Sequence, residues 1–308
     1  MHELIYTSAP KGLATGSRGF CTVAATADLP NSLAKKLEGL SGYNHLFDPG
    51  DNRNPINFSF VTFKDGGKLL YALSRVCDAG LDYTQRTNKF AHHVALNKAD
   101  LPDAGPVWFF DNAGIHEQSW PADKEPYRIP VKASKAASQQ PAVCNHWASI
   151  TGDAAHGGYL AEKFADRRTR DICLIYELGT DVLALINEAI RLLEPKDRWK
   201  ATFATYAGKA NAGHNCKLRC LVAGTDEAIA IAKSRHVVLI DLSNPPEINP
   251  NSIYTEIART GRRPTVESTV ATPPIAQDSA DIEHSDPVVV PQILTSIFAD
   301  EPSDGTAT

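Results

Sequence analysis

Short runs of apolar residues alternate with turn-forming residues over the first half of the chain, a pattern typical of β-strands joined by tight turns. Two pairs of these runs predict antiparallel hairpins: 4–6 with 20–25, and 58–63 with 68–76. The turn of the second hairpin, Lys64-Asp65-Gly66-Gly67, supplies positive φ angles cheaply. Between the hairpins, Leu33, Leu37 and Leu40 recur at helical spacing and predict one helix. We therefore expect a β-rich N-terminal lobe over residues 1–165.

Three further segments complete this lobe in the sequence pattern. Val107–Phe110 predicts another short strand. Asp153–Ala165 predicts a helix that contains the unfavourable pair Gly157-Gly158. Between them, residues 111–142 carry little periodicity and several prolines, which indicates a long surface segment that Trp120 anchors to the core.

From Asp171 onward, strand-like and helix-like patterns alternate regularly. The predicted strands lie at 172–176, 201–206, 218–223 and 237–242, and the predicted helices at 181–193 and 225–233. This β-α-β-β-α-β order is that of a ferredoxin-like unit. We therefore predict an α+β protein with a ferredoxin-like lobe over 166–242, either separate from the first lobe or part of one continuous domain over 1–242. Such a fold assigns no activity by itself.

The composition changes over residues 243–308, which hold nine of the twenty prolines and ten acidic residues but only three arginines. Low hydrophobicity with high net charge predicts a disordered acidic tail or linker. One apolar island interrupts it, in which four residues would share a face of a short helix: Ile293, Leu294, Ile297 and Phe298. This island is a candidate partner-docking peptide. The alternatives are the stub of a further domain or a segment without function.

Charge and cysteine content narrow the possible classes of function. Residues 1–242 hold 26 acidic and 28 basic residues, so the predicted folded part is nearly neutral and lacks the basic surface of a dedicated nucleic-acid binder. No apolar run approaches the roughly 18 residues of a membrane span. Without a recognisable signal peptide, the six cysteines favour a cytoplasmic protein with reduced thiols.

The stretch Gly80–Leu96 is the best candidate site, because a polar loop there leads directly into a buried strand. Its candidate ligand-binding residues are Asp82, Tyr83, Arg86, Asn88, His92 and His93. They include an acid, an anion-binding group and two side chains that titrate near neutrality. Neighbouring residues of a strand point to opposite faces, so only one histidine can join the loop residues. The stretch is therefore either a structural ion pair or a site for ligand binding and proton transfer.

Recognised catalytic motifs are absent from the sequence. It contains no P-loop, no dinucleotide-binding fingerprint and no nucleophile elbow, so nucleotide hydrolysis by this chain is not expected. His214, Cys216 and Cys220 form a weak zinc pattern that would need further ligands, such as Cys144 and His146, to meet them in space. We therefore expect neither a bound metal nor a cofactor, and a zinc-stabilised module remains only an alternative.

Several stretches resemble the bacterial GTPase-associated protein one family, and specifically its second type of N-terminal domain. These stretches are HELIYTSAPKGL, GSRGFCTVAAT, LEGLSGY, RVCDAGLDYTQRTNKFAHHVAL and RWKATFATY, in this order over residues 2–206. The resemblance implies a component of multi-protein bacterial conflict or stress-signalling systems, with a GTPase and other proteins as partners. Members of the family are considered adaptors or recognition subunits, and the nucleotide chemistry is done by other components.

Two hypotheses on function follow from the residues and from the resemblance. The first is a non-enzymatic adaptor, which the resemblance and the lack of catalytic motifs favour. The second is a hydrolase or ligand-binding enzyme that acts on a phosphorylated or nucleotide-like molecule. It would hold the anion with Arg86 and move a proton with Asp82 and either His92 or His93.

Overall fold

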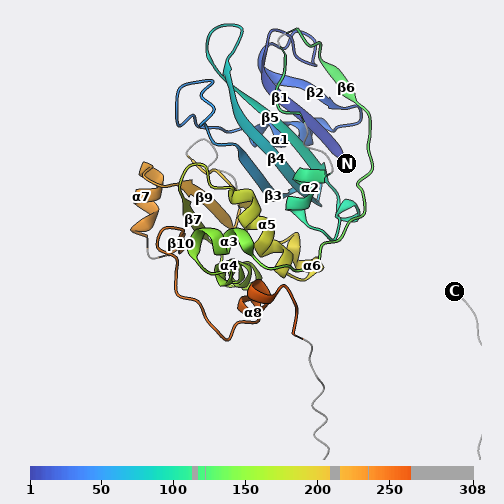
Figure 1. Cartoon of the computed structure of the whole chain (residues 1–308). Helices are drawn as coiled ribbons and strands as arrows, with labels where there is room; N and C mark the ends of the chain where they lie inside the picture. Colours follow the sequence, from blue (N-terminus) through green and yellow to red (C-terminus); the bar gives the residue numbers. More distant parts are fainter. Residues whose placement is uncertain (113–116, 122, 209–215, 235, 265–308) are drawn as a thin grey trace, which may run out of the picture. The chain divides into compact units, whose positions relative to one another are not determined.

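One mixed sheet of ten strands runs through the part of the chain that the computed structural model describes, residues 1–264 without 113–116, 122, 209–215 and 235 (Figure 1). The order of its strands is β10-β7-β9-β8-β3-β4-β5-β1-β2-β6. The strands are β1 (His2–Ala9), β2 (Gly19–Thr26), β3 (Asn57–Asp65), β4 (Lys68–Leu81), β5 (Thr87–Leu96), β6 (Tyr127–Ile129), β7 (Ile172–Tyr176), β8 (Phe203–Ala204), β9 (Leu218–Val222) and β10 (Val238–Asp241).

The helices lie on both faces of this sheet. They are α1 (Asn31–Gly39), α2 (Pro106–Asn112), α3 (Asn145–Thr151), α4 (Ala155–Ala165), α5 (Val182–Leu192), α6 (Pro195–Arg198), α7 (Asp226–Ala232) and α8 (Ile253–Thr260), with a short 3₁₀ helix at Lys98–Asp100. The apolar face of α5 packs in the main core with the buried residues of β7, whereas α7 packs with Cys173 and Ile175 on the other face of that strand. None of the helices in the described ranges is long and apolar enough to cross a membrane.

The N-terminal half of the sheet is antiparallel, as the turn residues predict. β1 pairs with β2 and β3 pairs with β4, which confirms both predicted hairpins. β5 pairs with both β4 and β1 and therefore joins the two hairpins into one sheet. Leu33 and Leu37 of α1 pack on one face of this half, so the predicted helix is also confirmed.

The C-terminal half of the sheet is parallel. β7 pairs in parallel with β10 and β9, and β9 pairs in parallel with β8. The predicted ferredoxin-like lobe is not confirmed, because that fold requires an antiparallel hairpin between its second and third strands. The Gly/Asn-rich segment after β8 resembles a tight turn in the sequence, but parallel neighbours need a connection that returns the chain to the same end of the sheet.

The two halves meet at β3 and β8, which pair antiparallel with Ser59 opposite Ala204 and Phe60 opposite Phe203. Thr205 extends this contact, since its hydroxyl accepts from the N–H of Phe58 at 2.8 Å and its own N–H donates to the carbonyl of Phe58 at 2.9 Å. The β-rich part and the α/β part therefore share one continuous sheet.

The predicted strand at Val107–Phe110 is wrong. Val107–Phe110 belongs to helix α2, which begins at Pro106. Proline is favoured in the first turn of a helix, and this short apolar run is compatible with a buried helix as well as with a strand. Trp120 does anchor the long surface segment, because its ring stacks on Tyr127 of β6 with 5.9 Å between the ring centroids.

The predicted start of the disordered tail, at residue 243, is wrong. Residues 243–264 are part of the fold, and α8 packs on α4 with Ile257 and Ala258 fully buried. The carbonyl of Ala258 also accepts from the N–H of Cys144 at 2.9 Å. The remaining tail and its candidate docking residues, Ile293, Leu294, Ile297 and Phe298, lie outside the described residues.

Candidate functional site

The loop between β4 and β5 is organised around the buried carboxylate of Asp82. This carboxylate accepts from the N–H and the hydroxyl of Thr84 at 2.7 Å each, and from the N–H and the guanidinium of Arg86 at 3.0 Å each. The hydroxyl of Ser8 donates to it at 2.8 Å. Burial alone would raise the pKa of Asp82, but these donors lower it well below its usual range. The predicted pair of Asp82 and Arg86 is thus present, and it closes the loop on itself.

Asn88 ties this loop to the first strand. Its side-chain oxygen accepts from the N–H groups of Ser8 at 3.0 Å and Lys89 at 2.8 Å. Asp82, Tyr83 and Asn88 line one pocket of about 340 Å³ together with Trp120. The structure therefore brings three of the predicted ligand-binding residues to one pocket, with Arg86 in contact with Asp82.

The two histidines of β5 contact different sets of partners, as strand alternation predicts. His93 lies between two hydroxyls, with Nδ1 2.7 Å from Ser74 and Nε2 2.8 Å from Ser41. His92 is buried on the other face, with Nε2 3.3 Å from the carboxylate of Glu3. No described contact joins either histidine to Asp82 or Arg86.

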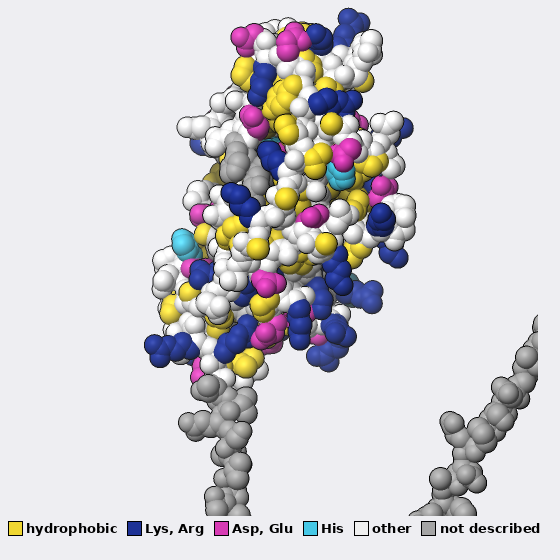
Figure 2. Space-filling view, turned by 90° about the vertical axis from the view of Figure 1, so that its right-hand side faces the viewer, with side chains coloured by type: hydrophobic (Ala, Val, Ile, Leu, Met, Phe, Trp, Pro, Cys, Tyr) yellow, Lys and Arg dark blue, Asp and Glu magenta, His cyan; other side chains and the backbone are white. Residues whose placement is uncertain are grey.

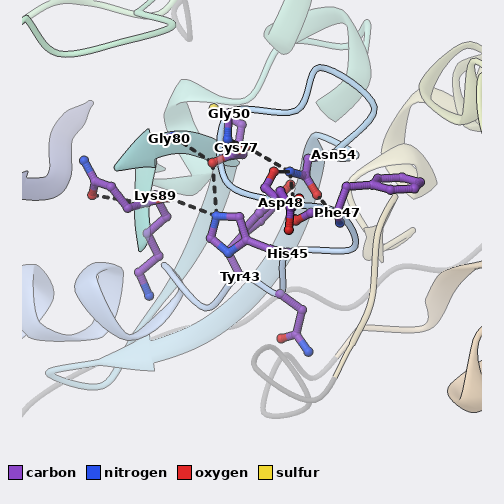
Figure 3. Close-up of polar contacts among 12 residues, drawn as sticks. Tyr43, His45, Phe47, Asp48, Gly50, Asn54, Cys77, Gly80 and Lys89 are labelled. Atoms are coloured by element: carbon purple, nitrogen blue, oxygen red, sulfur yellow. Dashed lines mark hydrogen bonds and ion pairs between the residues drawn. The ribbon is translucent and has the colours of Figure 1, made fainter. Parts of the chain in front are cut away.

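A second buried carboxylate, Asp78, holds the loop after α1 against β4. Figure 3 labels its partners His45, Gly50, Asn54 and Gly80. One of its oxygens accepts from His45 Nε2 at 3.0 Å and from the N–H of Gly80 at 2.7 Å. The other accepts from the N–H of Gly50 at 2.6 Å and from the side chain of Asn54 at 2.9 Å. Burial raises the pKa of Asp78, but these donors outweigh it and lower the pKa.

Asn54 links this carboxylate to the rest of the loop. Its side-chain oxygen accepts from the N–H groups of Leu46 and Phe47 at 2.9 Å each. Gly50 and Gly80 both have positive φ angles, of 88° and 66°, and their Cα atoms lie close together, which glycine allows at little cost. Asp48-Pro49-Gly50 marks a tight turn in the sequence, but no local pattern predicts that Asp78 holds this turn.

The loop held by Asp78 forms one wall of a cleft of about 640 Å³, which we call the carboxyl-end cleft. Its other wall follows the carboxyl end of β7 and includes Leu178, Gly179 and Asp181. Ligands of α/β sheets commonly bind beyond the carboxyl ends of parallel strands. This cleft was not predicted from the sequence, because it depends on the parallel pairing of the strands.

Apolar side chains are exposed in the carboxyl-end cleft. Ile56 is 40% and Leu178 is 41% exposed, and both line the cleft. Arg53 lies beside them with its guanidinium 4.1 Å from the ring centre of Phe47 and is paired with Asp51. At the start of α5, Asp181 already accepts from the N–H of Ala184 at 3.0 Å, so this helix end carries a negative cap. The cleft is suited to an apolar contact, with Arg53 and Asp181 as the charged residues of its lining.

The candidate zinc ligands do not form a cluster in the described part of the structure. Cys216 and Cys220 are buried, and burial raises the pKa of Cys216 to about 12 and that of Cys220 well above its usual value. Protonated thiols are poor metal ligands. His214 lies outside the described residues, and no group of three potential ligands converges among the described ones.

Comparison with protein families assigns most of the described chain. The model for GTPase-associated protein 1, N-terminal domain type 2, matches residues 1–133. The model for the middle domain of GTPase-associated protein 1 matches residues 144–244. No curated protein matches the chain. The two matches follow one another in the order of a single protein, and the chain belongs to the GTPase-associated protein 1 family, with the second type of N-terminal domain.

Proposed function

We propose that this chain is a non-enzymatic adaptor or recognition subunit of a GTPase-associated system of the bacterial conflict or stress-signalling kind. Membership in the family supports a GTPase-related role. We further propose that the GTPase binds at the carboxyl-end cleft. The observation that carries this proposal is the pair of exposed apolar side chains, Ile56 and Leu178, on its two walls.

The contacts of the polar residues in the β4–β5 loop favour a structural role for this loop over hydrolysis. Asp82 accepts from Thr84, Arg86 and Ser8, and a general base must instead reach the proton of a substrate. The alternative enzyme would also need His92 or His93 beside this carboxylate. Instead, His92 contacts Glu3, and His93 contacts Ser41 and Ser74.

The composition of the carboxyl-end cleft matches that of a protein contact. Interface centres are enriched in apolar and aromatic residues and in arginine, and a few such residues supply most of the binding energy. Ile56 and Leu178 supply the apolar part, and Arg53 stacks on Phe47 at the margin. The Asp78 contacts fix the loop that carries Ile56, so little conformational entropy is lost when a partner binds.

Affinity purification from the native host tests the proposal. The tagged chain should recover a GTPase that mass spectrometry identifies. Ile56→Asp and Leu178→Asp should each reduce its recovery about tenfold, because a charge in the centre of an apolar contact is left without a partner. Circular dichroism establishes that both variants remain folded.

Ile229→Asp is the matched control, because Ile229 is 49% exposed on α7 and does not line the carboxyl-end cleft. This variant should recover the GTPase as the unmodified chain does. The proposal is wrong if the unmodified chain recovers no GTPase. The binding site is wrong if Ile229→Asp reduces recovery as strongly as Leu178→Asp.

A further inference from the structure

A second cleft, of about 780 Å³, opens at the opposite ends of the parallel strands. Thr202 and Lys217, which directly precede β8 and β9, line this amino-end cleft. Arg167 and Arg170, from the loop before β7, line it as well. The parallel pairing of β7, β9 and β8 brings these three segments to the same edge of the sheet.

The lining of the amino-end cleft is strongly cationic. Four basic side chains face a single acidic one: Arg167, Arg170, Lys200 and Lys217, against Asp197. Asp197 is already paired with Lys200. The cleft therefore carries a net positive charge that its own lining does not neutralise.

The acidic residues near the cleft are bound to other cations. Asp166 pairs with Arg168 at 3.3 Å, and Asp171 pairs with Arg219 at 2.8 Å. Within the described ranges, Arg167 and Arg170 make no ion pair or side-chain hydrogen bond. Two guanidinium groups are thus available to an anion, and arginine binds phosphate oxygens through two parallel N–H groups.

Lys217 contributes a partly buried ammonium group. Its Nζ donates to the carbonyls of Phe164 at 2.9 Å and Asp166 at 2.8 Å, and burial lowers its pKa. These two contacts cap the C-terminal end of α4, which is a structural role. An ammonium group has three N–H donors, so one donor of Lys217 is not used by the described residues.

Aromatic side chains border the same cleft. Tyr254 of α8 and Phe164 of α4 both line it, and an aromatic face can stack on a planar ring of a ligand. We propose that the amino-end cleft binds a phosphorylated small molecule of about nucleotide size, with its phosphates at Arg167, Arg170 and Lys217 and its ring against Tyr254. The volume lies within the usual range of about 300–1,000 Å³ for small-molecule sites. This site is separate from the proposed GTPase contact.

Calorimetric titration of the full chain with ATP tests the proposal, and pyrophosphate serves as the ring-free comparison. We expect saturable binding of one ATP per chain, tighter than that of pyrophosphate. Arg167→Ala and Arg170→Ala should each weaken ATP binding about tenfold or more, because each removes charge-assisted hydrogen bonds to phosphate. Absence of saturable ATP binding would overturn the proposal, and equal affinity for pyrophosphate would overturn the role of Tyr254.

Basic side chains are not confined to the cleft, so specificity needs its own control. In Figure 2, Lys and Arg side chains gather over the lower part of the face shown. Arg168 is a matched control, because its side chain is 93% exposed, pairs with Asp166 and does not line the cleft. Arg168→Ala should leave ATP affinity unchanged. An equal loss in this variant would mean that ATP binds to a general basic surface, and the proposed site would be wrong.

Discussion

Asp78 and Asp82 lie close together at the end of β4, yet their carboxylates hold different segments. Asp82 closes the β4–β5 loop and contacts Ser8 of β1. Asp78 binds the loop that contains Gly50 and Asn54, which forms a wall of the carboxyl-end cleft. Each carboxylate accepts several hydrogen bonds. Removing the carboxylate leaves its donors unsatisfied, which lowers the stability of the fold.

Asp78→Ala should lower the free energy of unfolding by about 2 kcal/mol, because it leaves the partly buried donors of His45, Asn54 and Gly80 without an acceptor. Urea denaturation at neutral pH measures this change. Asp48→Ala is the control in the same loop, since the side chain of Asp48 is exposed and its carbonyl, which accepts from Asn54, is kept. Equal destabilisation by both substitutions would contradict a special role for Asp78.

The ion pair between Asp153 and Arg259 predicts a pH-dependent contribution to stability. The guanidinium of Arg259 lowers the pKa of Asp153 from 3.8 to about 2. A carboxyl whose pKa is lowered by folding stabilises the protein above its unfolded pKa, and this contribution is lost as the pH falls through the folded value. At neutral pH the chain should be more stable than Asp153→Asn by about 1 kcal/mol, since solvent weakens this partly exposed pair.

Urea denaturation at several pH values tests this contribution. The difference between the two proteins should persist down to about pH 4 and shrink toward about pH 2. In an Arg259→Ala background, Asp153→Asn should have little effect at any pH. A difference that grows on acidification would contradict the assigned direction of the pKa shift.

At the scale of elements, α8 packs closely against α4 at Gly158. A Cβ atom at Gly158 would lie 2.4 Å from the carbonyl oxygen of Tyr254, so the backbones of the two helices approach too closely for any side chain. Ile257 and Ala258 are fully buried in this contact. Because α8 also carries Tyr254, the position of this helix shapes the amino-end cleft.

Gly158→Ala should destabilise the protein by about 2 kcal/mol through overpacking, although alanine favours the helix itself. Chemical denaturation measures the change, and proteolysis of residues 253–260 reports whether α8 detaches. Gly39→Ala at the end of α1 is the control, because nothing lies within 4 Å of its added Cβ. An unchanged stability in Gly158→Ala would contradict the close contact of the two helices.

The elements that local periodicity encodes could be predicted from the sequence. The hairpins, α1 and α5 follow from turn residues and from apolar spacing within one segment. α8 could not, because its proline- and asparagine-rich surroundings resemble a disordered tail and its partner lies about a hundred residues away. Gly157-Gly158 was the available signal for it, since glycine pairs inside a helix often mark a close backbone contact.

The candidate site was predictable to a lesser degree. Asp82 and Arg86 are close in sequence, so their contact could be expected from the loop itself. Asn88 instead contacts Ser8 of the first strand, which the loop sequence does not predict. The hydrogen bonds of Asp78 come from residues in separate turns. The two clefts depend on which strands are neighbours in the sheet. Pairing over such sequence distances leaves no local pattern, so these contacts and clefts could not be predicted from the sequence.

At the scale of the whole molecule, the pairing of β3 with β8 joins two regions that separate family models match. Phe60 of β3 is fully buried and contacts the rings of Trp199 and Phe203. The hydrophobic cores of the two regions are therefore continuous. This continuity favours one domain rather than two independent lobes, and α8 extends that domain beyond the predicted limit of residue 242.

We expect residues 1–264 to unfold in one cooperative transition, since neither region keeps a complete core without the other. Denaturation followed by tryptophan fluorescence and by far-UV circular dichroism should give coincident curves. Hydrogen exchange should give β4 and β7 similar opening free energies. Two separate transitions, one for each matched region, would contradict a continuous domain.

Recognition of a GTPase at the carboxyl-end cleft is the central functional claim, and site-specific photo-crosslinking in the native host tests it most directly. A photoreactive residue replaces Leu178 in the cleft or, as the control, Ile229 on α7. We predict that position 178 crosslinks to a GTPase and that position 229 does not. A GTPase captured from position 229 but not from position 178 would contradict the claim.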